Sequence, residues 1–315
     1  MIVHSCFLIS VSLITALGLM LWWRLGKTPL KQRQLYLDHS HETPVGMLDF
    51  IVGFMIWLGL PTLAIGVLTA IWNVSELDSI DAQQTNTLMF SLGVAQLVGG
   101  ALILCLGIIR YGSIGWLFDS EIPFRQQCVL AAKSFCMVVP LVWSIQALLS
   151  LVVAYEHDTL EQLSENFSVW TMCATWFGAV IAAPFGEELI FRGALQSWLH
   201  RVCVPKDERD SVNEFAGGWR NERTDKFDTS SQPQSIQTRR LLWWLPILIS
   251  SALFALIHLG QGAAPIPLFL FAMGLGFLFR YTGSLIPCIV LHFMLNAFTM
   301  FWLTLQLMFP LKDAV

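Results

Sequence analysis

The chain has 315 residues, of which 55% are hydrophobic and only 13% are charged, and its mean hydropathy is +0.63. A soluble protein of this composition would expose more apolar surface than water tolerates, so the composition excludes that class and indicates an integral membrane protein. The net charge of −4 says little, because in a membrane protein the distribution of charge between loops carries the information. We expect the lipid bilayer as the surrounding medium and no nucleic-acid partner.

Apolar runs long enough to cross roughly 30 Å of hydrocarbon, about 20 residues each, can be counted along the chain. Eight such runs occur, at residues 2–23, 48–72, 88–109, 129–154, 168–190, 241–259, 264–279 and 284–308. The runs are unbroken rather than alternating, which favours helices over the strands of a membrane barrel. The sequence therefore predicts an all-α fold, a polytopic transmembrane bundle of about eight helices.

Basic residues gather in every second loop. Arg24 and Lys27 follow the first helix, whereas the next loop carries Glu76 and Asp81 and no Lys or Arg. The long segment 201–240 holds eight of the eighteen Lys and Arg, and its polar composition predicts a flexible loop. Because basic loops face the cytoplasm, this pattern predicts a multi-pass plasma-membrane protein with both termini outside and loop 201–240 inside the cell.

The chain divides into two parts by the presence of chemically reactive side chains in its helices. Residues 1–155 form four predicted N-terminal helices without a recognisable motif. Residues 168–308 form the predicted catalytic core, which loop 201–240 interrupts. We therefore expect the functional site in the C-terminal half.

Two adjacent carboxylates, Glu187 and Glu188, lie in a stretch that otherwise reads as buried in lipid. Inserting an ionised side chain at membrane depth costs about 2.5 to 3.5 kcal/mol on insertion scales. A catalytic role is therefore the first explanation for a pair of carboxylates placed there. Glu188 precedes Arg192 by four residues, the favoured order for an intrahelical ion pair, which leaves Glu187 free to face a cavity. A purely structural ion pair is the alternative. Pro184 just before them should leave the carbonyl of Val180 without its helical donor.

Other polar residues in the predicted spans have different readings. Asp49 begins the second helix, where a carboxylate suits the positive end of the helix dipole. His258 lies near the end of its span, and His292 and Asn296 share one face of the last helix at i and i+4. A lone intramembrane histidine usually bonds to a neighbouring helix. We expect the glutamate pair, His258, and His292 with Asn296 to contact one another, because an unpaired polar group in a water-free bundle raises the free energy of the folded state.

This set of residues predicts water activation. A desolvated glutamate beside histidine can take a proton from water and return it to a leaving amine. The imidazole N–H and the amide of Asn296 can stabilise the oxyanion, so the predicted reaction is peptide hydrolysis inside the membrane.

Zinc is the alternative, since carboxylates and imidazole are both zinc ligands. The zinc ligands would then be Glu187, Glu188, His258 and His292. Adjacent helical residues point about 100° apart, so closure of four ligands is less natural than water activation. We therefore expect no metal cofactor and keep zinc open as the alternative.

At these residues the sequence resembles the CPBP family, also called the Abi or CAAX amino-terminal protease family, which includes the type II CAAX prenyl endopeptidases. The family pattern consists of three short motifs, EExxxR, FxxxH and HxxxN, each in an apolar helix. They are matched in order by Glu187, Glu188 and Arg192, by Phe254 and His258, and by His292 and Asn296. The resemblance covers residues 168–305.

The resemblance implies an intramembrane endopeptidase of the glutamate type. Its substrates would be membrane-bound proteins or peptides, with lipid-modified ones among the candidates. Glu187 and His258 would activate water, and His292 and Asn296 would line the oxyanion site. The resemblance assigns supporting roles to Glu188, Arg192 and Phe254.

Two other functions remain open at this point. The protein could be a non-catalytic membrane protein, such as an immunity factor or scaffold, that keeps these residues for structure. It could also be a proton-coupled transporter, since intramembrane glutamate and histidine also mark proton relays. The intact motifs disfavour the first, and the absence of a detectable internal repeat disfavours the second.

Overall fold

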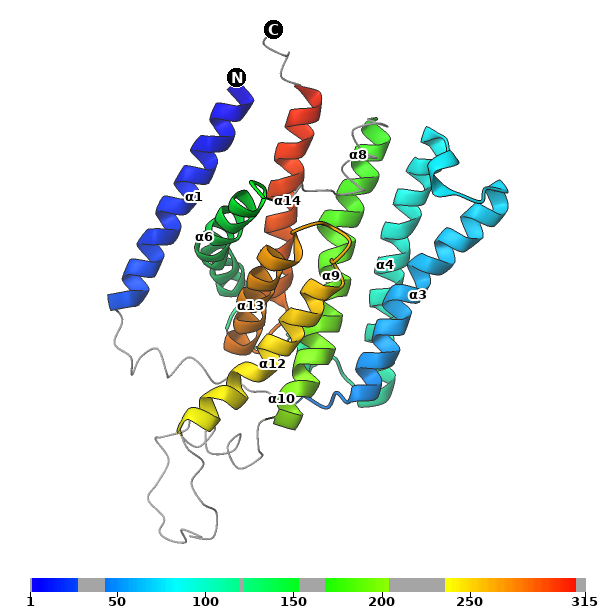
Figure 1. Ribbon diagram of the computed structural model, residues 1–315. Coiled ribbons are helices and arrows are strands. Elements are labelled where there is room, and N and C mark those ends of the chain that lie inside the picture. The colour runs from blue at the N-terminus through cyan, green and yellow to red at the C-terminus, as the bar shows by residue number, and fades with distance from the viewer. Residues whose placement is uncertain are drawn as a thin grey trace, which may run out of the picture.

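The computed structural model describes residues 2–27, 43–118, 120, 122–152, 168–203 and 236–309. Within these ranges every regular element is a helix, which confirms the predicted all-α class (Figure 1). The helices outside the central one are α1 (Ile2–Lys27), α3 (Met47–Trp72), η1 (Leu77–Ser79), α4 (Ala82–Tyr111), α5 (Gly115–Phe118), α6 (Phe124–Leu149), α12 (Ile236–Leu256), α13 (Pro265–Thr282) and α14 (Ile286–Met308). Residues 204–235, most of the predicted cytoplasmic loop, lie outside the described ranges.

The central helix runs without a break from Val169 to Cys203 over 35 residues. It is built of five segments that differ in their hydrogen-bond register. These segments are α8 (Val169–Trp176), η2 (Phe177–Ala182), α9 (Ala183–Glu188), η3 (Leu189–Gln196) and α10 (Ser197–Cys203). Both η2 and η3 are π-helical turns.

Seven helices in the described part of the chain are long and apolar enough to cross a membrane, so the protein is a multi-pass membrane protein. The predicted span 241–259 is the exception. Its helix, α12, has an apolar portion of only Leu242–Leu256, which is shorter than the roughly 20 residues that a crossing needs.

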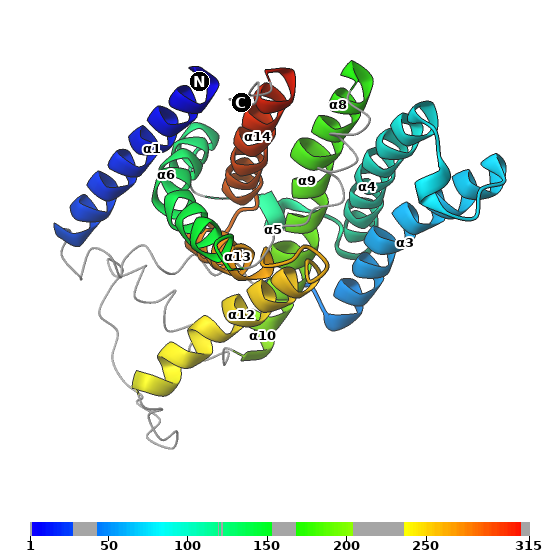
Figure 2. The ribbon, with the colours of Figure 1, turned by 45° about the horizontal axis from the view of Figure 1, so that its top comes forward.

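The pair α12–α13 forms a hairpin that turns back within the bundle. Figures 1 and 2 both show its turn beside α9, well short of the end where α1 begins and α14 finishes. Helix α13 is long enough to cross a membrane, but it belongs to a hairpin that enters and leaves the bundle at the same end. The hairpin therefore does not count as a crossing. The start of α1 and the end of α14 therefore lie at the same end of the bundle, as an even number of crossings requires.

Several predicted boundaries differ from the observed ones. Helix α10 continues to Cys203 and α12 begins at Ile236, so the predicted loop 201–240 is shorter at both ends. His258, which was predicted inside a helix, lies in the turn that follows Leu256. The chain then turns through Gly260 and Gly262, and Gly262 has a φ of +55° that favours glycine.

The predicted helix-start role of Asp49 is confirmed. Its Oδ2 accepts a hydrogen bond from the backbone N–H of Gly46 at 2.7 Å, which satisfies a donor at the beginning of α3. Helix α4 begins in a similar way, with a capping box in which Asp81 and Gln84 exchange side-chain to backbone bonds of 2.8 and 2.9 Å.

The remaining helices pack around the central one. Helix α3 lies against η3, α4 lies against α8, η2 and α9, and α14 lies against η2 and α9. Helix α1 stands at the edge of the bundle and packs on α6 (Figure 2). At this contact a Cβ added to Gly18 would lie 2.0 Å from the carbonyl oxygen of Cys136, so only glycine allows the two backbones to approach so closely.

We predict that Gly18→Ala destabilises the protein by about 1 to 3 kcal/mol, because the added methyl group forces α1 away from α6. Gly26→Ala is the matched control on the same helix, since no atom of the described residues lies within 4 Å of a Cβ there. Thermal unfolding of the detergent-purified protein would measure both variants. Equal melting temperatures for Gly18→Ala and Gly26→Ala would contradict the proposed close contact.

Candidate active site

The central helix changes register on both sides of the two adjacent glutamates. In the first π segment, the backbone N–H of Ala183 bonds to the carbonyl of Gly178, five residues earlier. The second π segment begins at Leu189, directly after Glu188. Such segments are rare and occur frequently at functional sites, because they re-aim the side chains around them.

Pro184, the second residue of α9, leaves a carbonyl of the preceding π segment without a backbone donor. Proline has no N–H, so the carbonyl that would receive its bond is left without a backbone donor. In the five-residue register that carbonyl belongs to Ala179, not to Val180 as a regular α-helix would predict. The Nδ2 of Asn296 on α14 donates to the Ala179 oxygen at 2.7 Å and replaces the missing donor. Asn296 therefore ties α14 to the central helix at the point where proline breaks the ladder.

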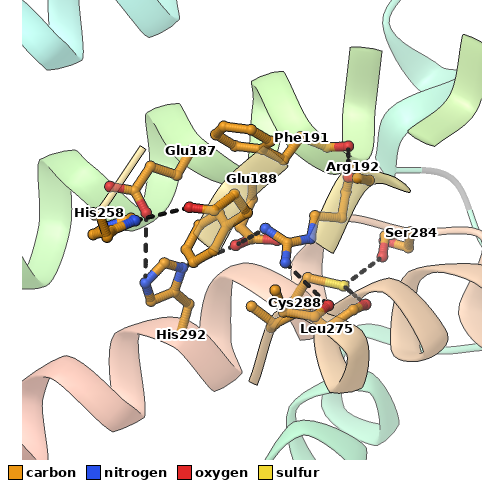
Figure 3. A network of polar contacts seen from close by, with 12 residues as sticks. Glu187, Glu188, Phe191, Arg192, His258, Leu275, Ser284, Cys288 and His292 are labelled. Carbon is orange, nitrogen blue, oxygen red and sulfur yellow. Dashed lines mark hydrogen bonds and ion pairs between the residues drawn. The ribbon is translucent and has the colours of Figure 1, made fainter. Parts of the chain in front are cut away.

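Glu188 lies at the centre of the polar network in Figure 3. Its Oε1 accepts a bond from Nη1 of Arg192 at 3.1 Å, and both side chains are completely buried, which confirms the predicted ion pair. The same oxygen lies 2.9 Å from Nδ1 of His292. A second guanidinium nitrogen, Nη2, donates to the carbonyl of Ala272 on α13 at 3.1 Å. One carboxylate thus joins the central helix to α14 directly and to α13 through Arg192.

The bond to Glu188 fixes the proton arrangement on His292. A carboxylate only accepts, so Nδ1 of His292 carries the proton that it donates. The other ring nitrogen, Nε2, then points to Glu187, whose Oε2 lies 3.8 Å away. At this distance the two groups face each other without a direct hydrogen bond.

Glu187 differs from its neighbour because no hydrogen bond holds its carboxylate in the described part of the chain, and its side chain keeps 11% of its surface exposed. Figure 3 shows the ring of His258 beside it, on the side away from Arg192. Nδ1 of His258 lies 2.8 Å from the carbonyl oxygen of Phe254, which only accepts, so Nδ1 is the protonated nitrogen. In the neutral ring Nε2 is therefore an acceptor.

Phe254 forms a shared wall of the site. The Arg192 guanidinium lies over its ring at 4.8 Å, a cation–π contact inside a buried environment. The rings of His258 and His292 lie 5.1 and 6.0 Å from the same phenyl ring. The phenylalanine of the FxxxH motif therefore contacts three of the polar groups and keeps water from one side of them.

Six of the seven predicted site residues lie together in the structure, five as a polar cluster and one as its aromatic wall. The seventh makes its contact elsewhere. The cluster consists of Glu187, Glu188, Arg192, His258 and His292, with Phe254 as its wall. Asn296 lies one turn further along α14, and the contact of its amide is with Ala179.

Trp57 is a contact of the site that the sequence did not indicate. Its indole lies so close to Gly186 that a Cβ there would be 2.7 Å from Nε1, and its ring meets Phe191 edge to face at 6.2 Å. Phe191 in turn packs on Phe254 at 5.2 Å. Helix α3, from the half of the chain without a motif, therefore packs against the central helix behind the two glutamates. A glycine directly before the two glutamates was the only sequence signal of this close approach.

The described residues do not form a group of three His, Cys, Asp or Glu side chains arranged to hold a metal ion. Of the four predicted zinc ligands, Glu188 uses Oε1 for Arg192 and for His292, and His258 uses Nδ1 for a backbone carbonyl. Nε2 of both histidines and the carboxylate of Glu187 keep the lone pairs that a zinc ion would need, so zinc stays the alternative to water activation.

Comparison with known families supports the reading of the motifs. Residues 169–298 match the family model for Rce1-like type II CAAX prenyl endopeptidases. This match confirms the resemblance to the CPBP proteases seen in the three motifs. No curated protein and no solved structure matches the chain.

We predict that Asn296→Ala destabilises the protein by about 1 to 3 kcal/mol, because the half-buried carbonyl of Ala179 loses the side-chain donor that replaces the missing N–H of Pro184. Pro184→Ala restores a backbone N–H and should therefore recover part of the loss in the double variant. Thermal unfolding of the two single variants and the double variant forms the required cycle. Strictly additive effects would show that the amide does not replace the donor that proline lacks.

Proposed function

We propose that the protein is an intramembrane endopeptidase that hydrolyses peptide bonds with a water molecule activated by Glu187. The observation that carries this proposal is the unequal environment of the two glutamates. Glu188 is held by Arg192 and His292, whereas Glu187 faces two histidine rings and forms no hydrogen bond with the residues that the structure describes. The match to CAAX prenyl endopeptidases supports the same reaction class.

In the proposed reaction Glu187 acts as the general base. The water oxygen attacks the carbonyl carbon while its proton passes to the carboxylate, and the C–N bond then breaks as the amine takes up that proton. His258 holds the water through the lone pair of Nε2, since its other nitrogen donates to Phe254. Atoms and charges balance without a further reagent, because the water supplies both the hydroxyl and the proton.

The tetrahedral oxyanion needs donors that are already in place. Asn296 supplies one, because an amide nitrogen carries two N–H groups and only one is used by Ala179. His292 would supply a second from Nε2 only as an imidazolium, because its Nδ1 already donates to Glu188. Each such donor is worth about 2.7 to 4 kcal/mol in known enzymes.

The position of the site indicates the kind of substrate. His258 lies in the α12–α13 turn, inside the bundle rather than at either end (Figure 1). A peptide bond cleaved there must enter the membrane region, so we propose membrane-bound polypeptides, prenylated ones included, as substrates. The family description, which names a prenyl endopeptidase, supports the prenylated class.

Glu187→Gln should lower cleavage at least about 100-fold, because the nearly isosteric amide cannot accept the proton of water. The first assay uses a prenylated CAAX peptide with the purified protein in vesicles. An unbiased assay compares the peptide termini in membranes of cells that express either form.

Two controls make this test specific. Glu76→Gln changes an exposed glutamate outside the site and should leave cleavage unchanged. An unaltered melting temperature of Glu187→Gln shows that the fold is intact. Full turnover by a folded Glu187→Gln protein would refute the proposed base.

Turnover should survive removal of divalent metals, because in the proposed reaction Glu187 takes the proton of water directly and no metal ion takes part. The experiment treats the purified protein with a chelator, measures cleavage of the same peptide, and determines bound zinc by elemental analysis. A stoichiometric metal whose removal stops turnover and whose return restores it would contradict the water-activation mechanism.

A further inference from the structure

A cavity lies between α3, α4, α5 and η3, on the side of the central helix that faces away from the candidate active site. Its volume is about 210 Å³. Leu117, Leu189 and Ala194 form its buried floor, with exposed fractions of 4%, 2% and 7%. Neither the proposed reaction nor the three motifs uses this cavity.

The rim of the cavity is apolar and open to the surroundings of the bundle. Val52 on α3 and Leu106 on α4 line it with exposed fractions of 40% and 43%, and Ile109 with 80%. Apolar side chains at the outside of membrane-spanning helices face lipid. A polypeptide segment would need partners for its N–H and C=O groups, which these walls do not offer. The walls suit a hydrocarbon chain.

One end of the cavity is charged. Arg110 pairs with Asp49 at 3.2 Å, and the hydroxyl of Tyr111 donates to the same carboxylate at 2.5 Å. Arg201 is close by, since a Cβ on Gly46 would lie 3.6 Å from its Nη2 and 3.4 Å from Oδ2 of Asp49. Two arginines against one aspartate leave this end with a net positive charge.

Arg110 has donors to spare. Its side chain is 51% exposed, and the contact to Asp49 uses only part of a guanidinium that carries five N–H groups. The charged end lies where α3 begins and α4 finishes, beside Tyr111 and Trp116, residue types that mark the membrane interface. This places a cation at the level of lipid phosphates and an apolar cavity directly beneath it.

We propose that this cavity binds one anionic membrane phospholipid, with an acyl chain between α3 and α4 and the phosphodiester at Arg110. The lipid is distinct from the substrate. Leu189 and Gly193 face the cavity, whereas Glu188 and Arg192, each one position earlier, face α13 and α14. The body of the catalytic helix therefore separates the lipid from the reacting groups.

The test is native mass spectrometry of the full-length protein titrated with phosphatidylglycerol or with phosphatidylcholine of the same acyl chains. The wild type should retain one phosphatidylglycerol in preference to phosphatidylcholine. Arg110→Gln should weaken phosphatidylglycerol binding about fivefold and remove the preference. Arg125→Gln, a change of an exposed arginine outside the cavity, should alter neither.

A second variant tests the acyl-chain cavity itself. Gly107→Leu fills the cavity and should abolish retention of both lipids, whereas Gly59→Leu on α3, where nothing lies within 4 Å of a Cβ, should not. Val52→Phe fills the cavity from the opposite wall and replaces Gly107→Leu if that variant fails to fold.

Two outcomes would overturn the proposal. One is equal retention by the wild type and a folded cavity-filling variant. The other is displacement of the lipid by a farnesylated cysteine ester, which would make the cavity a site for the substrate's prenyl chain. Loss of peptide cleavage in Glu187→Gln with lipid retention intact would separate this proposal from that of the catalytic function.

Discussion

The buried carboxylate of Glu188 is the constraint on which the site depends. Burial of an ion pair costs several kcal/mol per ion, and only good geometry with further hydrogen bonds offsets that cost. Here Arg192 supplies the opposite charge, the carbonyl of Ala272 accepts a second guanidinium bond, and His292 donates to the shared oxygen. Because these contacts come from the central helix, α13 and α14, the requirement to satisfy one carboxylate also fixes three helices. Glu187 is then the carboxylate of the pair that no hydrogen bond holds within the described residues.

Several helices around the two glutamates depart from regular α-helical geometry or contact the pair closely. Two π segments bracket the glutamates, and the one that contains the proline gap is closed by Asn296 from α14. The α12–α13 hairpin turns within the bundle and thereby brings His258 beside Glu187 (Figure 3). Helix α3 adds Trp57, which packs on Gly186. The N-terminal helices are therefore part of the support of the site, although the family match begins only at residue 169.

The sequence predicted the helical class, most spans, the pair Glu188–Arg192 and the convergence of two histidines, because four-residue spacing and the cost of unpaired polar groups are local or general rules. It missed features that tertiary contacts decide. The orphaned carbonyl is that of Ala179 rather than Val180, because hydrophobic periodicity does not reveal a π register. The contact of Trp57 with Gly186 was missed because it joins two helices that are distant in sequence.

The central claim is that Glu188 holds His292 through Nδ1 and so turns Nε2 toward Glu187. Nitrogen-15 NMR of the full-length protein with labelled histidine measures the protonation of each ring nitrogen directly, and loss of one signal in His292→Gln assigns the residue. The account predicts a proton on Nδ1 of His292 and a changed signal in Glu188→Gln. A neutral ring protonated only at Nε2, unaffected by that substitution, would contradict it.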